Sequence, residues 1–328
     1  MRVSNPGLYT TVQDLGRNGY QSIGIPTSGA MDEYSLRIAN LLVSNEESCA
    51  CLEFTITGPT VIFEEKTSFA LACDADAFLN EERVEGWRSY IAYPEDVLRV
   101  GRMKRGCRGY LSFAGGINSP VILGSRSCCA VAKIGKPLRA GDELTTNSAE
   151  RPEKKLETRF IPQWKNDVRV LLGPQDDHFT ERGMNTFLGS EYKVTDNADR
   201  MGYRLEGNRI EHREGKREII SDGNPLGAVQ VPGDGEPIVL MKDRQTTGGY
   251  PKIATVITPD VSDVAQMKPG STLRFEAVTL EKAYSILAED KKRLDEIKAS
   301  FSPPVSKPIK RYKMIINGKE HQIEVEEL

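Results

Sequence analysis

Short apolar runs, each bounded by Gly, Pro, Asn or Asp, recur along most of the chain. Their lengths and their β-branched and aromatic residues are typical of β-strands. Because the runs are many, short and well separated, they predict a mainly β protein built from barrels or sandwiches. The predicted strands are Thr60–Phe63, Ser68–Cys73, Val97–Val100, Gly109–Phe113, Asp167–Leu172, Pro237–Met241, Ile253–Ile257 and Ser271–Phe275.

Three segments repeat apolar residues at the spacing of a helix instead. The first, Asp32–Leu42, begins with an acidic residue that can cap a helix. The second, Asp177–Leu188, is interrupted by Gly183, which lowers helix propensity. The third, Thr279–Phe301, starts at a capping residue and is followed by two prolines, so it predicts a long helix with a charged outer face.

A polar segment of residues 147–165, which contains two prolines, separates two strand-rich halves. The length of 328 residues is typical of two domains, and we predict them at residues 1–155 and 156–301. Residues 302–328 form a Pro-rich linker and one hairpin around an Asn-Gly pair. A single hairpin cannot bury a core, so this tail is expected to dock on the body, join a partner or stay mobile.

The charges of the chain nearly balance, with 44 Lys and Arg against 47 Asp and Glu. A net charge of -3 gives no electrostatic reason to expect nucleic acid or an anionic membrane as partner. The sequence contains no apolar run that could span a membrane, and its N-terminus lacks the apolar core of a signal peptide. We therefore expect a cytoplasmic protein.

Six cysteines and three histidines bear on metal and thiol chemistry. No CxxC pair occurs, and no histidine lies close to a cysteine in the sequence, so no metal site is expected. Reduced, mostly buried cysteines are the first interpretation. A catalytic thiol at Cys128 or Cys129 is the alternative, which the shortage of histidines disfavours.

Polar residues and glycines are dense between Gly7 and Asn40. Gly29 lies just before the first predicted helix, and a helix N-terminus favours an anion such as a carboxylate. The segment offers the polar side chains of Gln13, Asp14, Arg17, Ser28, Asp32 and Asn40, of which we take Asp14 and Arg17 as candidate site residues. The alternative is ordinary turn chemistry, with Asp14 and Arg17 as a local surface pair.

A second polar cluster occupies a Gly-rich loop between two apolar runs of residues 229–257, a common form of small-molecule site. The cationic side chains of this loop can bind a carboxylate or phosphate, and its amide side chain can form hydrogen bonds with an amide group of a ligand. We expect this loop to line a ligand cleft near the first cluster; the alternative is a long polar hairpin loop. The clustered residues are Asp243, Arg244, Gln245, Thr246, Thr247, Tyr250 and Lys252. Arg200 can also hold an anion, although isolated arginines are often structural.

Both clusters lie in segments that resemble one family, the carboxyltransferase-type family of allophanate hydrolase subunit 2, or KipA-like proteins. The resemblance runs from about Met1 to Ala288. It is carried by GLYTTVQDLGRNGYQSIGIPTSGAMD, LEFTITGP, LGSRS, DRMGYRLEG and AVQVPGDGEPIVLMKDRQTTGGYPKIATV. The resemblance implies two cyclophilin-like β-barrel domains, which agrees with the predicted strands and linker.

The resemblance also implies an activity and partners. The family includes the C subunit of the prokaryotic ATP-dependent 5-oxoprolinase, which opens the lactam of 5-oxoproline to give glutamate. Its partners in that enzyme are a KipI-like B component and a LamB/YcsF-type A component. ATP belongs to the assembled complex, and the glycines of this chain match neither a P-loop nor a Rossmann fingerprint. We expect the isolated chain to be inactive.

Opening a lactam requires cations near the developing negative charge and donors that position the amide. For this reaction we predict Arg244 and Lys252 as the electrostatic pair. Asp14 or Asp243 is expected to act as base or as orienting residue. The predicted substrate-binding residues are Gln245, Thr246, Thr247, Tyr250, Arg17, Gly29 and Arg200.

Two alternative functions stay open. In the first, the chain is the carboxyltransferase component of a biotin-dependent urea or amide carboxylase, with biotin on another chain. The tail YKMIINGKEHQIEVEEL motivates this alternative, because it resembles the opening strands of a biotinyl carrier domain. In the second, the chain is a KipA-like regulator that sequesters a KipI-like kinase inhibitor.

Overall fold

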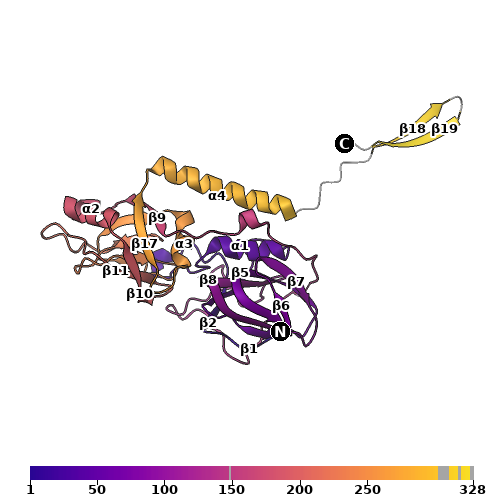
Figure 1. Cartoon of the computed structure of the whole chain (residues 1–328), viewed down its shortest axis with the longest axis horizontal. Helices are drawn as coiled ribbons and strands as arrows, with labels where there is room; N and C mark the ends of the chain where they lie inside the picture. The colour runs from indigo at the N-terminus through magenta and orange to yellow at the C-terminus, as the bar shows by residue number, and fades with distance from the viewer. Residues whose placement is uncertain (148, 302–309, 317–318, 326–328) are drawn as a thin grey trace.

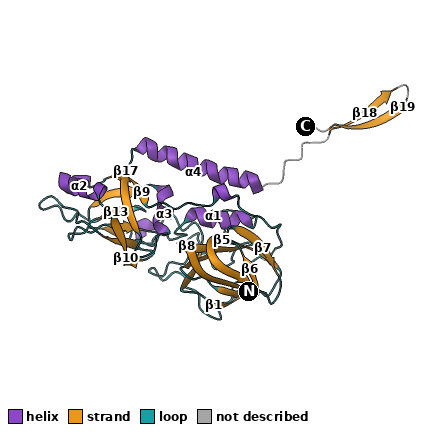
Figure 2. Ribbon diagram, in the orientation of Figure 1, coloured by secondary structure: helices purple, strands orange, loops and turns teal. Residues whose placement is uncertain are grey.

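The computed structural model describes residues 1–147, 149–301, 310–316 and 319–325. Two β-rich lobes lie side by side, and one long helix runs along both of them (Figure 1). Strands are the main regular secondary structure of each lobe, as Figure 2 shows, so the mainly β fold class is confirmed. The helices of the described residues are α1 (Glu33–Leu42), α2 (Glu181–Gly189), α3 (Val261–Ala265) and α4 (Leu280–Phe301).

The first lobe is built on one eight-stranded sheet. Its strands are β1 (Arg2–Asn5), β2 (Tyr9–Gln13), β3 (Cys51–Thr55), β4 (Thr60–Ile62), β5 (Thr67–Leu79), β6 (Glu82–Val84), β7 (Arg88–Ala92) and β8 (Val97–Phe113). The main path runs β1-β4-β8-β3-β2, and β5 pairs with β6, β7 and β8. The register between β5 and β8 shifts between Ala72 and Ala77, and such bulges curl the sheet.

An irregular segment covers the gap between the edge strands β1 and β2. Leu138 N donates to Thr10 O of β2 (2.8 Å), and Val3 N of β1 donates to Asp142 O (2.9 Å). These bonds satisfy backbone groups that a regular strand would otherwise pair. The first lobe is therefore a curled sheet completed by a loop, whereas the family resemblance implied a barrel.

The second lobe is a closed barrel with the strand order β10-β11-β14-β13-β16-β9-β17. Its strands are β9 (Asp167–Leu172), β10 (Tyr192–Ala198), β11 (Gly202–Glu206), β13 (Ala228–Gln230), β14 (Ile238–Leu240), β16 (Lys252–Val256) and β17 (Thr272–Ala277). A small two-stranded sheet, β12 (Asp222–Gly223) and β15 (Thr247–Gly248), lies in its loops. Met31 from the first half of the chain belongs to the apolar core of this barrel, so the two lobes share buried surface.

Helices α1 and α4 form because each combines a capping residue with an apolar face. Asp32 caps α1 by accepting a hydrogen bond from Ser35 N (3.0 Å). Helix α4 packs Ile286 on the second lobe and buries Ile297 in the cluster around α1. Since its two halves contact different lobes, α4 braces them against each other, as Figure 1 shows.

Two sequence predictions of local structure were wrong in detail. The predicted strands at residues 97–100 and 109–113 are the two ends of one strand, β8, because the polar residues between them also pair with β5. The helix predicted from Asp177 begins at Glu181, since Thr180 caps it by accepting from Gly183 N (2.9 Å).

The cysteines are free thiols, as expected from the sequence. Burial raises the pKa of Cys128 to about 11, and burial also raises the pKa of Cys129. Both thiols are therefore protonated near neutral pH and are poor nucleophiles. This result disfavours the alternative of a catalytic thiol.

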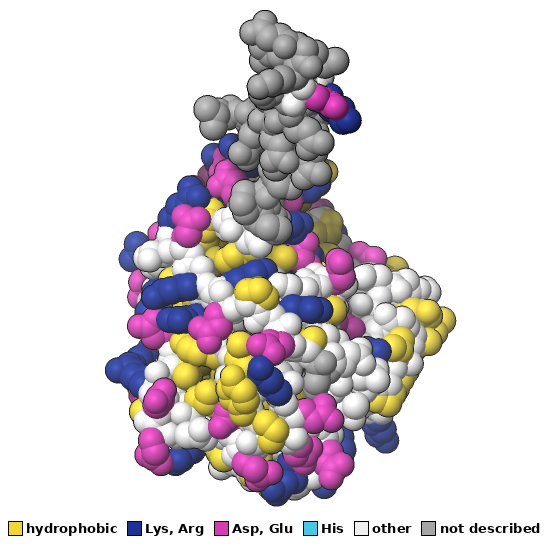
Figure 3. All heavy atoms as spheres, turned by 90° about the vertical axis from the view of Figure 1, so that its right-hand side faces the viewer, with side chains coloured by type: hydrophobic (Ala, Val, Ile, Leu, Met, Phe, Trp, Pro, Cys, Tyr) yellow, Lys and Arg dark blue, Asp and Glu magenta, His cyan; other side chains and the backbone are white. Residues whose placement is uncertain are grey.

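The tail contains β18 (Lys310–Ile316) and β19 (Lys319–Val325), which pair as an antiparallel hairpin. The Asn-Gly pair that predicted its turn and most of the Pro-rich linker lie outside the described residues. One face of the molecule mixes cations and anions without a large area of one sign (Figure 3). None of the helices in the described part of the chain is both long and apolar enough to cross a membrane.

Candidate functional site

The two polar segments singled out in the sequence meet where the two lobes face each other. Ser28 N donates to Lys242 O (3.0 Å), and Ser28 Oγ donates to Asp243 Oδ1 (2.7 Å). Arg244 Nη1 lies 3.5 Å from Thr27 Oγ1. The fold thus brings residues more than 200 positions apart into one polar region.

A buried ion-pair cluster centred on Arg200 lies in this region. The guanidinium binds Asp243 through Nε (2.9 Å) and Nη2 (3.1 Å), and it pairs with Glu53 of the first lobe through Nη1. Burial alone would lower the pKa of Arg200, but the two carboxylates raise it. The charges of Arg200 and Asp243 therefore compensate each other inside the protein, and the cluster connects the two lobes.

Hydrogen bonds extend this cluster along the boundary between the lobes. Glu53 Oε2 accepts from Tyr110 OH (2.8 Å), and Tyr110 OH accepts from Asp32 N (2.8 Å). Asp32 Oδ2 accepts from Gln266 Nε2 (2.8 Å), and Gln266 Oε1 accepts from Arg108 N (3.0 Å). Of these residues, only Gln266 belongs to the second lobe. It therefore links the hydrogen-bond network of the first lobe to the second lobe. Asp32 was identified from sequence as a helix cap and not as a site residue. Glu53, Arg108, Tyr110 and Gln266 were missed, because no local motif marks them.

Asp14 is buried and organises the loop that contains the LGSRS segment. Its Oδ1 accepts from Gly16 N (2.7 Å), Ser125 Oγ (2.6 Å) and Ser127 Oγ (2.5 Å), and its Oδ2 accepts from Arg126 N (2.6 Å). A carboxylate with four donors is held in one orientation and is already satisfied. This geometry favours the orienting role predicted for Asp14 over the role of a base.

Replacing Asp14 by alanine should lower the free energy of unfolding by about 2–3 kcal/mol, because buried donors lose a charged acceptor. Urea unfolding of the purified chain measures this change. The exposed Asp177, replaced in the same way, serves as the control and should shift stability by less than about 0.5 kcal/mol. Equal stability of the Asp14 and Asp177 variants would contradict the structural role.

Arg17 and Gln13 lie side by side under the same loop. Arg17 Nη2 donates to Ser127 O, and Gln13 Nε2 donates to the next carbonyl, Cys128 O (3.0 Å). Both side chains are almost fully buried, at 1% and 0% exposure. Arg17 Nε and Nη1 and Gln13 Oε1 have no hydrogen-bond partner within the described residues. The alternative of an exposed Asp14–Arg17 pair is thereby excluded.

Gly29 serves backbone packing rather than anion binding at a helix N-terminus. Its φ is 90°, and a Cβ there would lie 2.8 Å from Gly16 N. Gly29 O accepts from Arg200 Nη2 (2.7 Å). The N-terminus of α1 is capped by Asp32, and burial raises the pKa of this carboxyl. The predicted anion at this helix start is corrected accordingly, because a side chain of the protein already fills the position.

Arg244 is a buried cation whose contacts are neutral. It is 4% exposed and donates to Asn224 O through Nε (2.8 Å) and to Met241 O through Nη1 (3.3 Å). Within the part of the chain that the structure describes, no carboxylate pairs with it. Burial lowers the pKa of Arg244 to about 10. A guanidinium held in this way favours an anionic ligand.

Lys252 and the other residues of the Gly-rich loop differ in how far their side chains are buried. The Lys252 side chain is 1% exposed, and its Nζ lies 3.5 Å from Oδ2 of the exposed Asp222. Gln245 is exposed and approaches Gln230 Oε1 through Nε2 (3.5 Å). The remaining predicted binding residues of the loop are half-buried Thr246 and exposed Thr247 and Tyr250.

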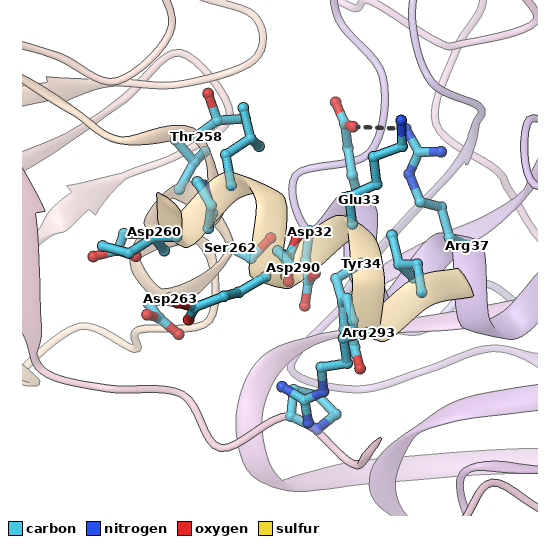
Figure 4. Close-up of a pocket in the computed structure, with 18 of the residues that line it drawn as sticks. Asp32, Glu33, Tyr34, Arg37, Thr258, Asp260, Ser262, Asp263, Asp290 and Arg293 are labelled. Carbon is cyan, nitrogen blue, oxygen red and sulfur yellow. Dashed lines mark hydrogen bonds and ion pairs between the residues drawn. The ribbon is translucent and has the colours of Figure 1, made fainter. Parts of the chain in front are cut away.

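A separate pocket of about 700 Å³ lies between α1, α3 and α4 (Figure 4). Its lining includes Asp32, Glu33, Asp263 and Asp290. In the described part of the chain, none of the predicted site residues lines it, and Lys242 is its only contribution from the Gly-rich loop. Arg244 is thus buried near the lobe boundary and Lys252 is buried within the second lobe, and this pocket is not the cleft expected for them.

Burial, together with the neighbouring charge of Asp260, raises the pKa of Asp263 in this pocket to about 7. The folded protein therefore holds a proton that the unfolded chain loses near pH 4. The free energy of unfolding is therefore highest below pH 4 as far as this group is concerned. It declines between pH 4 and pH 7, because there the unfolded chain releases the proton and the folded protein keeps it. Asp263→Asn should remove the decline and raise the free energy of unfolding at pH 8 by about 2–4 kcal/mol.

Urea unfolding at pH 5 and pH 8 measures this effect, with Asp177→Asn as the exposed control. The wild type should lose more stability than Asp263→Asn between the two pH values. A parallel pH dependence of both proteins would show that Asp263 is ionised throughout.

Residues 23–277 match the family described as carboxyltransferase domain, subdomain A and B. The match covers most of the chain, and the chain belongs to this family. Its resemblance to the carboxyltransferase-type proteins is thereby confirmed.

Curated relatives extend over nearly the same length. The chain is 38% identical to the C subunit of 5-oxoprolinase from Escherichia coli over 307 residues, which cover 90% of this chain and 97% of the relative. It is 36% identical to the C subunit of 5-oxoprolinase from Haemophilus influenzae, over 88% of this chain and 94% of the relative. Urea amidolyase of Lachancea kluyveri is 32% identical over 86% of this chain, but only 17% of that protein is covered.

Solved structures show the same two-lobed arrangement inside larger chains. The urea amidolyase of K. lactis is similar with a TM-score of 0.85 and 30% identity, over 90% of this chain and 20% of that one. The Kluyveromyces lactis urea carboxylase is similar with a TM-score of 0.84 and 28% identity, over 99% of this chain and 32% of that one. The chain thus spans about a fifth to a third of these enzymes.

Proposed function

We propose that this chain is the C subunit of an ATP-dependent 5-oxoprolinase. It acts with a KipI-like B component and a LamB/YcsF-type A component to open the lactam of 5-oxoproline to glutamate. The bacterial relatives named as C subunits of 5-oxoprolinase support this proposal, because 94% and 97% of their lengths align with this chain. Alignment over the whole length of a relative favours a shared role more than alignment to a module of a larger enzyme does.

The chemical part of this proposal rests on Arg244, which is buried and has no carboxylate partner among the described residues. 5-Oxoproline is an anion with an amide group, and Arg244 binds the neutral backbone carbonyls of Asn224 and Met241. A preorganised cation in a water-poor site stabilises negative charge far better than water does. The region therefore has the charge and hydrogen-bonding character that an anionic amide requires.

The proposed roles follow the positions of the side chains. Lys252 stabilises negative charge that develops on the lactam oxygen. Arg244 supplies a second buried cation, which binds the anionic substrate. Gln245 and Thr246 position the amide, with Thr247 and Tyr250 at the exposed end of the loop. Asp14 and Arg200 hold the surrounding loops and lobes, and the Asp243 carboxylate stays paired with Arg200.

The roles proposed for this chain concern the lactam alone. Its sequence contains neither the glycine spacing of the P-loop nor that of the Rossmann fingerprint. ATP is therefore assigned to the assembled complex as a whole.

A carboxyltransferase component of a biotin-dependent urea or amide carboxylase is the second candidate. It is favoured by the likeness to urea amidolyase and to urea carboxylase, the latter over 99% of this chain. In that case biotin belongs to a carrier on another chain. The same buried cations would then face a carboxylated carrier and a neutral amide.

Purification of the tagged chain from its host, followed by mass spectrometry of bound proteins, separates the two candidates. We expect partners of the KipI and LamB/YcsF types and ATP-dependent release of glutamate from 5-oxoproline by the isolated complex. Recovery of a biotin carboxylase, with consumption of urea and bicarbonate and no release of glutamate, would contradict the proposed function and support the second candidate.

A further inference from the structure

The cations near the lobe boundary differ in how their charge is compensated. Arg200 binds two carboxylates, and Lys252 approaches Asp222. Arg17 and Arg244 make their hydrogen bonds only to neutral oxygens among the described residues. Arg108 also binds only neutral partners, among them Tyr203 OH and Ala265 O, so Arg17 and Arg244 are two of three buried guanidinium groups that have no carboxylate partner among the described residues.

Both arginines lie against the turn that contains Thr27. Arg17 N donates to Thr27 O (2.8 Å), and Arg244 Nη1 lies 3.5 Å from Thr27 Oγ1. The neighbouring Ser28 Oγ is 2.8 Å from Cys128 O, the carbonyl that Gln13 also contacts. The backbone of Arg17 and the guanidinium of Arg244 therefore meet at this turn, while the side chains of Arg17 and Gln13 reach the adjacent carbonyls Ser127 O and Cys128 O.

Gln13 contributes an unused acceptor beside the unused donors of Arg17. A carbonyl oxygen can only accept, so Nε2 of Gln13 faces Cys128 O and its Oε1 faces away. Oε1 is buried without a partner in the described part of the chain, as are Nε and Nη1 of Arg17. Buried polar atoms are nearly always hydrogen-bonded, so such a set of donors and acceptor indicates a missing ligand.

We propose that Arg17 and Arg244 bind a carboxylate of the substrate and that Gln13 Oε1 accepts a hydrogen bond from an adjacent N–H. Arginine binds carboxylates well because its planar fork keeps its charge at all relevant pH values. A carboxylate one carbon away from an amide N–H satisfies all three side chains. This inference rests on the proposed function, since 5-oxoproline has that arrangement, and it specifies how the substrate is recognised.

The cover over these atoms consists of loops. Residues 14–20 and 118–147 contain no α-helix and no β-strand in the described structure. Loops of this kind move more easily than strands, which gives a ligand a route to the buried atoms.

The test is the kinetics of the assembled complex with 5-oxoproline and with 2-pyrrolidinone, which has the same lactam and no carboxylate. Arg244→Gln and Arg17→Gln should raise KM for 5-oxoproline by about 10- to 100-fold with a smaller change in kcat. The inhibition constant of 2-pyrrolidinone should change by less than about threefold. Arg204→Gln, which changes an exposed arginine on β11, is the matched control.

Two further variants keep the test valid if a glutamine variant folds poorly. Arg244→Lys retains the charge and should give a KM between those of the wild type and Arg244→Gln. Gln13→Glu places a carboxylate beside Arg17 and should weaken 5-oxoproline binding. Its second oxygen would face Cys128 O, so the thermal midpoint is expected to fall. Thermal unfolding of every variant reports whether it is folded.

Equal effects of the arginine variants on 5-oxoproline and 2-pyrrolidinone, or no effect on either, would overturn the anion site. Absence of glutamate release by the wild-type complex would contradict the proposed function itself and would also remove the ligand inferred here. The two failures are distinguishable, because the first requires an active wild-type complex.

Discussion

Replacement of Arg200 by alanine should lower the free energy of unfolding by about 3–5 kcal/mol. The change leaves the carboxylates of Glu53 and Asp243 buried and unpaired at the boundary between the lobes. Because the two acids come from different lobes, we expect lobe packing as well as global stability to suffer. Urea unfolding of the purified chain measures the loss, and limited proteolysis of the segment between the lobes reports their separation.

Arg204→Ala is the matched control, since Arg204 is exposed on β11 only four positions away. It should change stability by less than about 0.5 kcal/mol. A triple variant with Arg200→Met, Glu53→Leu and Asp243→Leu should recover part of the loss, because no unpaired charge stays buried. Equal stability of Arg200→Ala and Arg204→Ala would show that the cluster does not hold the lobes together.

Replacement of Lys252 by methionine in the assembled complex should lower kcat for 5-oxoproline by about 10²- to 10³-fold. This magnitude is typical when one preorganised charge is removed from a developing oxyanion. Methionine keeps the apolar stem in the buried position, so the change tests the ammonium group more than the packing. The measurement is ATP-dependent glutamate release under saturating 5-oxoproline.

Lys193→Met serves as the control, because Lys193 is an exposed strand lysine that pairs with Glu206. It should leave kcat within about twofold of the wild type. The two cations are expected to differ in their kinetic effect: substitution of Lys252 changes mainly kcat, whereas substitution of Arg244 changes mainly KM. A folded Lys252→Met complex with unchanged kcat would remove Lys252 from the proposed chemistry.

Periodicity in the sequence was sufficient for the main elements. The helices at residues 33–42 and 280–301 and the strands around Asp167 and Ile253 follow from local apolar patterns, which depend on neighbours a few residues apart. The continuous strand β8 was harder to predict, because its charged middle section is stabilised by pairing with β5.

The pairing of charges could not be predicted from the sequence. Arg200 and Glu53 are 147 positions apart, and neither lies in a motif that indicates the other. The sequence therefore placed Arg200 among the binding residues, whereas its charge is compensated inside the protein. By contrast, the density of polar residues on the Gly-rich loop marked Arg244 and Lys252 as candidates for a ligand cleft. The structure buries both side chains, and their role in binding stays a prediction.

The most direct test of the proposed function is glutamate release from 5-oxoproline and ATP by the partner proteins, with and without this chain. We predict release that requires this chain, scales with its concentration up to equal stoichiometry and is absent from the chain alone. Release that is equally fast without this chain, or no release when all the partners are present, would contradict its role in a 5-oxoprolinase.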